Sequence, residues 1–186
     1  MPVQLGAAPE HGFDQPLGLL SDCHRRIENF LAALHKIATD AGETLDERQR
    51  KAAEAALSYF RTAAPRHNAD EEQSLFPLLR ACESTEARAA MDTVDALERD
   101  HATADPVHAR IDTLYRRWID AGSITPPDRT QLKNDLESLR AMYRRHIEVE
   151  DRQIFPLAGR VLSREQLHRV GQEMAGRRGV SPQKRA

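Results

Sequence analysis

The chain has 186 residues, of which 30% are charged and 40% are hydrophobic, and its formal net charge is -2. This length suffices for one domain with its own core, and the near-neutral charge gives no reason to expect a nucleic-acid partner. No apolar run approaches the length that a bilayer requires, and residues 1–15 show no secretory signal. The two cysteines, Cys23 and Cys82, are too few for a disulfide framework, so we expect reduced thiols in a cytoplasmic protein.

Turn and capping signals divide the chain into helices, and its abundant Ala, Leu, Arg and Glu favour that structure. The first helix should begin at Pro16 and end near Gly42. Further signals, in chain order, are a capping box at residues 44–47, a cap at Ser84 or Thr85, Gly122, Thr125 with Pro126, and a capping box at residues 163–166. Pro65 and Pro106 fall inside predicted helices and should kink or interrupt them.

Apolar residues in each predicted helix recur in alternating steps of three and four, which indicates one buried face. Four such helices joined by short loops predict an all-α protein, an up-down-up-down four-helix bundle with a short C-terminal fifth helix. We place an N-terminal extension at 1–13, the bundle at 14–162, the short helix at 163–175 and a basic flexible tail at 176–186.

Polar residues interrupt the buried face of all four bundle helices. They are His24 on the first helix, His67 and Glu71 on the second, His101 on the third, and His146 and Glu150 on the fourth. An uncompensated buried carboxylate is costly, so these groups need a partner. The midpoint between each consecutive pair of the four histidines falls at a predicted turn. In an antiparallel bundle this places the four histidines at one level, facing inward.

A repeated phrase carries four of these six residues. HNADEEQSLFP at residues 67–77 has a near copy, HIEVEDRQIFP, at residues 146–156. In each copy a His and a Glu four residues apart lie on one helix face, about 6 Å apart along the axis, within reach of one metal. The same spacing recurs at His24 and Glu28, so spacing alone is weak support. The two copies stand apart because their pairs lie on the buried face and end in Phe-Pro, which should plug that end of the site and bend the helix.

Imidazole nitrogen and carboxylate oxygen together suit iron, zinc or manganese. Four imidazoles and two carboxylates exceed the needs of one tetrahedral zinc ion. They suit two metals bridged by the two carboxylates, with two histidines on each metal and open positions for a small molecule. Around the ligands, Glu28 and Asp105 are candidate hydrogen-bond acceptors, with a solvated flank as the alternative. We expect His108 and Tyr143 to be core or neighbouring residues rather than ligands.

The six residues and the two Phe-Pro endings resemble the hemerythrin-like, or HHE cation-binding, family over residues 14 to 162. The resemblance implies a four-helix bundle whose cofactor is two Fe ions, an oxo-bridged di-iron centre, with Zn or Mn fitting less well. It implies a protein that binds or responds to O2, NO or peroxide, in iron homeostasis or in defence against nitrosative and oxidative stress. Oxygen-carrying hemerythrins have a further histidine where this chain has Asp105, so the resemblance favours the four-histidine bacterial type over reversible oxygen carriage.

Other functions remain open on the sequence alone. A ferritin-like di-iron oxidase would use Glu-x-x-His pairs, which occur at residues 98–101 and 165–168. A metal-free regulatory or interaction module would use the buried polar residues to set helix register. The sequence leaves open enzymatic turnover of peroxide or NO and the oligomeric state. It shows no phosphate-binding loop, nucleophile triad or nucleic-acid-binding stripe, and no feature of a membrane protein.

Overall fold

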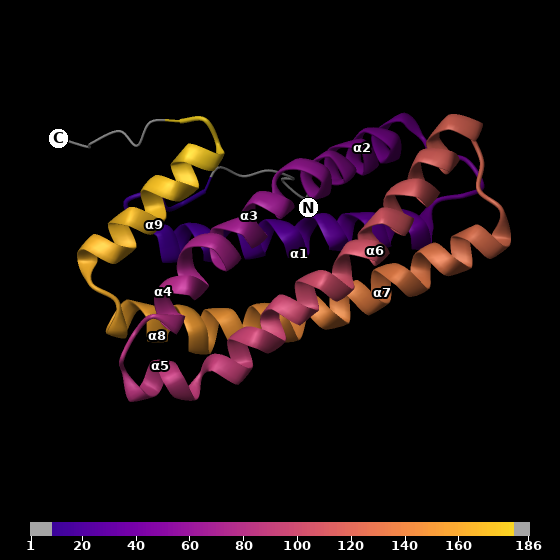
Figure 1. Ribbon diagram of the computed structural model, residues 1–186. Helices are drawn as coiled ribbons and strands as arrows, with labels where there is room; N and C mark the ends of the chain where they lie inside the picture. The colour runs from indigo at the N-terminus through magenta and orange to yellow at the C-terminus, as the bar shows by residue number, and fades with distance from the viewer. Residues whose placement is uncertain (1–8, 181–186) are drawn as a thin grey trace.

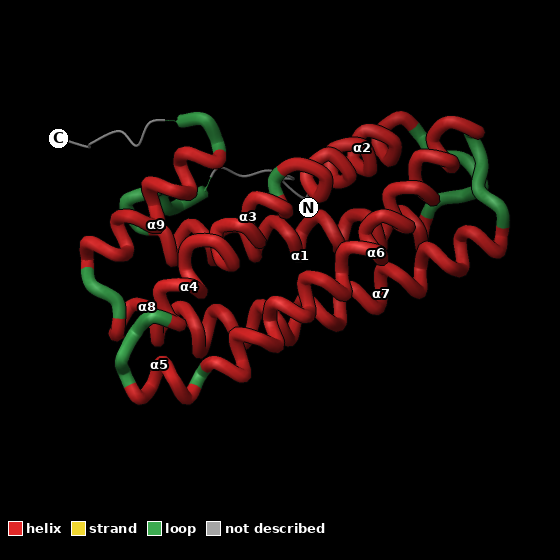
Figure 2. Tube along the Cα trace, viewed as in Figure 1, coloured by secondary structure: helices red, strands yellow, loops and turns green. Residues whose placement is uncertain are grey.

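The computed structural model describes residues 9–180, and this part of the chain is helical without strands (Figures 1 and 2). The long elements are α1 (Pro16–Asp40), α2 (Glu47–Thr62) continued by α3 (Ala64–Asp70), α6 (Met91–Ala121) and α7 (Pro126–Val149). α1 packs against α2 and α7, and α6 packs against α7. Consecutive long elements run in opposite directions in Figure 1, so the predicted up-down-up-down bundle is confirmed. The short C-terminal helix is α9 (Arg164–Arg177).

Most helix ends follow the sequence signals. Ser163 caps α9 and Thr125 caps α7, and Gly122 ends α6 with a φ of 76°, a left-handed conformation that glycine adopts without strain. The capping box predicted at residues 44–47 is wrong by two residues. Asp46 is the N-cap of α2 and exchanges hydrogen bonds with Gln49, because aspartate is the stronger cap and lies directly before the first helical residue.

Both copies of the repeated phrase contain a π-helical turn. η1 (Glu71–Leu75) leads into α4 (Phe76–Arg80), and η2 (Glu150–Ile154) leads into α8 (Phe155–Val161). The amide of Phe76 donates to the carbonyl of Glu71, and the amide of Phe155 donates to the carbonyl of Glu150. The proline after each phenylalanine has no amide hydrogen and its ring would crowd the carbonyl four residues earlier, so the wider turn accommodates it.

The two prolines inside predicted helices behave differently. Pro65 stands at the junction where α2 ends and α3 begins, so the predicted interruption is confirmed there. Pro106 lies within α6, which continues without a break to Ala121. Pro106 and Ala102, whose carbonyl loses its usual partner, are both exposed, so water can satisfy that carbonyl and the helix tolerates the proline.

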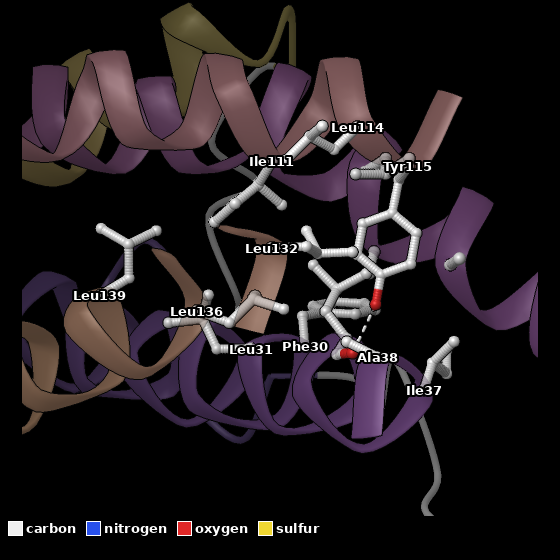
Figure 3. Packing of buried hydrophobic residues seen from close by; sticks show 14 of the residues in the cluster. Phe30, Leu31, Ile37, Ala38, Ile111, Leu114, Tyr115, Leu132, Leu136 and Leu139 are labelled. Carbon is white, nitrogen blue, oxygen red and sulfur yellow. Dashed lines mark hydrogen bonds between the residues drawn. The ribbon is translucent and has the colours of Figure 1, made fainter. Parts of the chain in front are cut away.

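The bundle has two apolar clusters separated by a polar layer. One cluster includes Leu31, Tyr115 and Leu136, whose side chains pack together in Figure 3. The other includes Leu20 and Phe76, and residues of α8 and α9 form part of it. Burial of each large apolar side chain contributes about 1.5–3 kcal/mol. The two clusters therefore stabilise the bundle on either side of a layer that contributes little apolar burial itself.

α9 packs against α3 and η1. The carboxylate of Asp70 is fully buried and accepts from Arg177 at 3.0 Å and from Arg178 at 2.7 Å. The predicted start of the flexible tail at residue 176 is therefore too early. Arg177 and Arg178 are ordered because the buried Asp70 carboxylate would be unpaired without them. The last part of that tail, residues 181–186, lies outside the described residues.

No helix within residues 9–180 is both long enough and apolar enough to cross a membrane.

Candidate metal centre

All six polar residues predicted for the site lie in the layer between the two apolar clusters. They are His24 from α1, His67 from α3, Glu71 from η1, His101 from α6, His146 from α7 and Glu150 from η2. Each is at most 3% exposed. Each occupies a position where the helical pattern places an apolar residue, so the folding of the bundle itself brings the six side chains together.

The four histidines form two pairs, each from neighbouring elements. The ring centroids of His24 and His67 are 4.9 Å apart. The Nε2 atoms of His101 and His146 are 3.1 Å apart. We call these the His24/His67 pair and the His101/His146 pair.

Glu71 lies between the two pairs. Its Oε1 is 3.3 Å from Nε2 of His67 and 3.8 Å from Nε2 of His24. Its other oxygen, Oε2, is 3.6 Å from Nε2 of His101. One carboxylate thus presents one oxygen to each pair, which is the geometry of a bridging ligand.

Glu150 also reaches both pairs, through a single oxygen. Its Oε2 is 3.0 Å from Nε2 of His24 and 3.1 Å from Nε2 of His146. The donor atoms of the layer form two overlapping groups, in each of which all atoms lie within 4.8 Å of one another. One group comprises His24, His67, Glu71 and Glu150, and the other His101, His146 and Glu150. Both groups are compact enough to hold a metal ion.

Several buried atoms in the layer lack a hydrogen-bond partner among the described residues. Both carboxylate oxygens of Glu71 and of Glu150 are without one, as is Nε2 of His24. Each buried unsatisfied polar atom costs about 1–3 kcal/mol, and more when charged. Cations bound in the layer would give these atoms partners, so the residues present fit bound metal.

The electrostatics of the layer favour protons or a metal cation between the two carboxylates. Burial, reinforced by the charge of Glu150, raises the pKa of Glu71 to about 8. Burial alone would lower the pKa of His24, but the carboxylates of Asp151 and Glu150 beside its two ring nitrogens outweigh burial and raise that pKa well above its ordinary value. For His146 burial is likewise outweighed, by Glu150, and the pKa is raised. A metal entering the layer must therefore displace protons.

A second carboxylate follows each of the two glutamates and contacts a histidine on another helix. Oε1 of Glu72 is 2.7 Å from Nδ1 of His101. Oδ1 of Asp151 is 3.0 Å from Nδ1 of His24. Such contacts at the outer ring nitrogen leave Nε2 facing inward.

The other two histidines of the layer, His146 and His67, differ in whether Nδ1 has a carboxylate partner. Nδ1 of His146 is 3.4 Å from Oδ2 of Asp100. Nδ1 of His67 is buried and has no hydrogen-bond partner among the described residues. Three of the four histidines thus have a carboxylate at Nδ1.

For Glu28 and Asp105 the structure agrees with the alternative of a solvated flank, and other residues lie at the outer ring nitrogens. Glu28 and Asp105 are exposed and form no hydrogen bond with His24 or His101 among the described residues. They are four residues from those histidines on the same helix, whereas the acceptors come from other helices. The acidic residue that both copies of the repeated phrase place directly after the glutamate was the signal that could have identified Glu72 and Asp151.

Tyr143 and His108 lie beside the layer rather than in it. Nε2 of His108 is 3.0 Å from the hydroxyl of Tyr143, whose ring meets His146 edge to face at 6.0 Å. Burial lowers the pKa of His108 to about 4. The neutral His108 ring therefore accepts a hydrogen bond from Tyr143, and among the described residues it makes no hydrogen bond with the six residues of the layer.

Other histidines lie away from the layer. His11 contacts Asp22 in front of α1, and His35 lies 3.5 Å from a glutamate of α7. His168 is exposed on α9. The ferritin-like pattern needs His168 and Glu98 at the site, but Glu98 pairs with Arg80 on the surface. The structure does not bring the two Glu-x-x-His sequences together.

A surface hollow of about 440 Å³ reaches the layer. His101 contributes to its lining together with Glu72, Glu98 and Asp105. The described residues that line it include three carboxylates and no lysine or arginine. The hollow offers a cation or a small neutral molecule a path to His101.

Comparison with known proteins agrees with this geometry. The model of a protein family described as the hemerythrin HHE cation binding domain matches residues 15–158. An uncharacterized protein of Haemophilus influenzae is 28% identical to this chain over 176 residues, which cover 90% of this chain and 92% of that protein. The family match spans the whole bundle and includes all six residues of the layer.

Proposed function

Because the chain belongs to the hemerythrin HHE cation-binding domain family, we propose that it is a non-haem iron protein that binds two iron ions in the buried layer. The observation that carries this proposal is the placement of Glu71 and Glu150, each of which reaches both histidine pairs. A single metal would need only one pair. Two pairs with two shared carboxylates match a two-metal site with bridging ligands.

The donor set is one that iron accepts, and it argues against a closed zinc site. It consists of imidazole nitrogen and carboxylate oxygen without a thiolate, a combination that suits iron or manganese, and it exceeds what a closed tetrahedral zinc site uses. His24 and His67 would hold one ion, His101 and His146 the other, and Glu71 and Glu150 would span both. Bound iron would supply a redox-active centre with open positions for a small ligand.

We propose O2, NO or peroxide as the ligand, with a function in iron homeostasis or in defence against nitrosative or oxidative stress. The apolar clusters on both sides of the layer exclude bulk water, and the hollow at His101 is a route by which a small molecule could reach the layer. A cytoplasmic location fits the two free thiols, Cys23 and Cys82.

Metal analysis of the purified chain tests this proposal. We expect about two iron ions per chain after anaerobic loading, and about one in either His67→Ala or His146→Ala, since each variant disables one pair. The absorption spectrum should change when O2, NO or hydrogen peroxide is added. A loaded protein that retains zinc in place of iron, or that retains no metal, contradicts it.

A metal-free interaction module predicts a different outcome. Its buried carboxylates would have to be satisfied by protein groups, but Glu71 and Glu150 have no such partners among the described residues. If the module were correct, thermal unfolding of the wild type would be the same with and without iron.

A further inference from the structure

We propose that Glu72 and Asp151 are positioning residues, each of which orients one ligand histidine and thereby sets the metal affinity of one histidine pair only. Glu72 would act on the His101/His146 pair and Asp151 on the His24/His67 pair. This inference rests on the proposed function, because it requires that both pairs bind metal. The two residues explain the second acidic position of the repeated phrase, which the metal site itself does not use.

Glu72 is placed to fix the ring of His101. Its side chain is 37% exposed, whereas that of His101 is 4% exposed, and Oε1 lies 2.7 Å from Nδ1. A hydrogen bond donated by Nδ1 to this carboxylate selects the tautomer with a free Nε2 lone pair. That Nε2 atom lies 3.6 Å from Glu71 and 3.1 Å from His146, so it faces the centre of the layer.

Asp151 does the same for His24. Oδ1 of Asp151 lies 3.0 Å from Nδ1 of His24, and Nε2 of that ring lies 3.0 Å from Oε2 of Glu150. Oδ1 also accepts a hydrogen bond from the hydroxyl of Ser21 at 2.7 Å. The carboxylate is therefore held from the same helix that carries His24, which restricts the ring further.

The two contacts have the same pattern around the bundle. Successive residues of a helix point about 100° apart, so a glutamate that faces inward places the next residue toward an adjacent helix. From η1, Glu72 reaches His101 on α6, and from η2, Asp151 reaches His24 on α1. Taking the four long elements as a ring, each copy of the repeated phrase orients the one histidine of the layer that the next helix carries.

The two pairs are not equally supported. In the His101/His146 pair both Nδ1 atoms contact carboxylates, those of Glu72 and Asp100. In the His24/His67 pair only His24 does, because Nδ1 of His67 has no partner among the described residues. A carboxylate at Nδ1 raises the basicity of the ligand and restricts its orientation. The His101/His146 pair should therefore bind its metal first.

Titration of the metal-free full-length chain with Co²⁺ under anaerobic conditions, followed by the visible absorption of the bound ion, tests the inference. His67→Ala leaves the His101/His146 pair as the intact pair, and His146→Ala leaves the His24/His67 pair. In the His67→Ala background, Glu72→Ala should weaken Co²⁺ binding about 10–100-fold, and Asp151→Ala should leave it unchanged. In the His146→Ala background the two effects should be exchanged.

Two further sets of variants separate positioning from loss of charge. Glu72→Gln and Asp151→Asn keep an oxygen that can accept the Nδ1 hydrogen, so each should recover part of the affinity that the alanine variant loses. Glu98→Ala is the matched control, because Glu98 is a carboxylate of the same hollow that pairs with Arg80 and contacts no histidine among the described residues. Adding Glu98→Ala to either single-pair background should leave the Co²⁺ affinity of that background unchanged.

The exchange of effects between the two backgrounds supports the inference. Equal weakening of both pairs by either alanine variant, or weakening no greater than that of Glu98→Ala, overturns it. If the single-pair variants bind no Co²⁺, the same contrast is read from the two binding steps of the otherwise wild-type chain, where a common shift of both steps overturns it. A wild-type chain that binds no Co²⁺ and no iron contradicts the proposed function instead.

Discussion

Single residues in the layer are arranged for a cation rather than for one another. Glu71 and Glu150 point their oxygens at imidazole nitrogens, yet these oxygens form no hydrogen bond among the described residues. A pair of buried carboxylates satisfied only by protons would be an expensive way to stabilise a helical bundle. The layer is therefore expected to lower the stability of the metal-free protein and to raise that of the loaded one.

Replacement of Glu71 by glutamine tests this expectation. Burial raises the pKa of Glu71 to about 8, so the group is largely protonated in the metal-free protein at neutral pH, and Glu71→Gln should change its melting temperature little. The wild type should gain about 3 kcal/mol from a metal at a hundred times its dissociation constant, and the variant should lose most of that gain. Thermal unfolding with and without Fe²⁺ measures both values. An equal gain in the two proteins would contradict the assignment of Glu71 as a ligand.

Metal affinity should rise with pH between 6 and 8. The pKa values of His24 and His146 are raised and that of Glu71 is raised to about 8. Below those values the groups hold protons, so the metal must displace them, and each displaced proton weakens binding roughly tenfold per pH unit of acidification. Co²⁺ titrations at several pH values, with proton release followed in weak buffer, measure the effect. Affinity that is independent of pH would show that these groups do not bind the metal.

The six residues of the layer could be predicted because each breaks the apolar pattern of its own helix, and short turns set their level. Glu72 and Asp151 could not be predicted from spacing within one helix, because their partners belong to other helices. The repeated phrase indicates that both positions are special, but it does not predict which histidine each residue contacts.

Among the helices, α9 depends on close packing that sequence patterns do not reveal. A Cβ atom at Gly171 would lie 1.9 Å from the carbonyl oxygen of Phe13, so the chain in front of α1 crosses α9 at this glycine. The buried Asp70 then holds the end of the helix through Arg177. The basic composition after residue 175 is typical of a loose tail. The ion pairs with Asp70, which is distant in the sequence, show that residues 177 and 178 belong to the folded part.

Gly171→Ala should destabilise the protein by about 1–3 kcal/mol, because the backbone of Phe13 would have to move away from α9. Gly176→Ala is the matched control in the same helix, since a Cβ there meets nothing within 4 Å. It should be neutral or stabilising by up to about 1 kcal/mol. Urea unfolding measures both changes. Equal stability of the two variants would mean that the segment before α1 does not pack on α9 in solution.

The ends of the helices show what capping signals can and cannot predict. Ser163, Thr125 and Gly122 act as predicted because their effect is local. The π-helical turns after Glu71 and Glu150 were not predicted, although the Phe-Pro endings suggested a bend. Which hydrogen bond a helix gives up before a proline depends on the neighbours that its side chains pack against.

At the scale of the whole molecule, two apolar clusters support a polar layer that has little apolar burial of its own. The bundle topology could be predicted because its loops are short and each of the four helices has one buried face. The division of the core into two clusters follows from the same pattern, since the histidines replace apolar residues at one level of all four helices.

Anomalous X-ray scattering at the iron edge, from crystals of the iron-loaded chain, would show whether this layer binds two metals. We predict two peaks about 3.5–4 Å apart, one at the His24/His67 pair and one at the His101/His146 pair, with Glu71 and Glu150 in contact with both. A single peak that all four histidines share, or peaks outside the layer, would contradict the account.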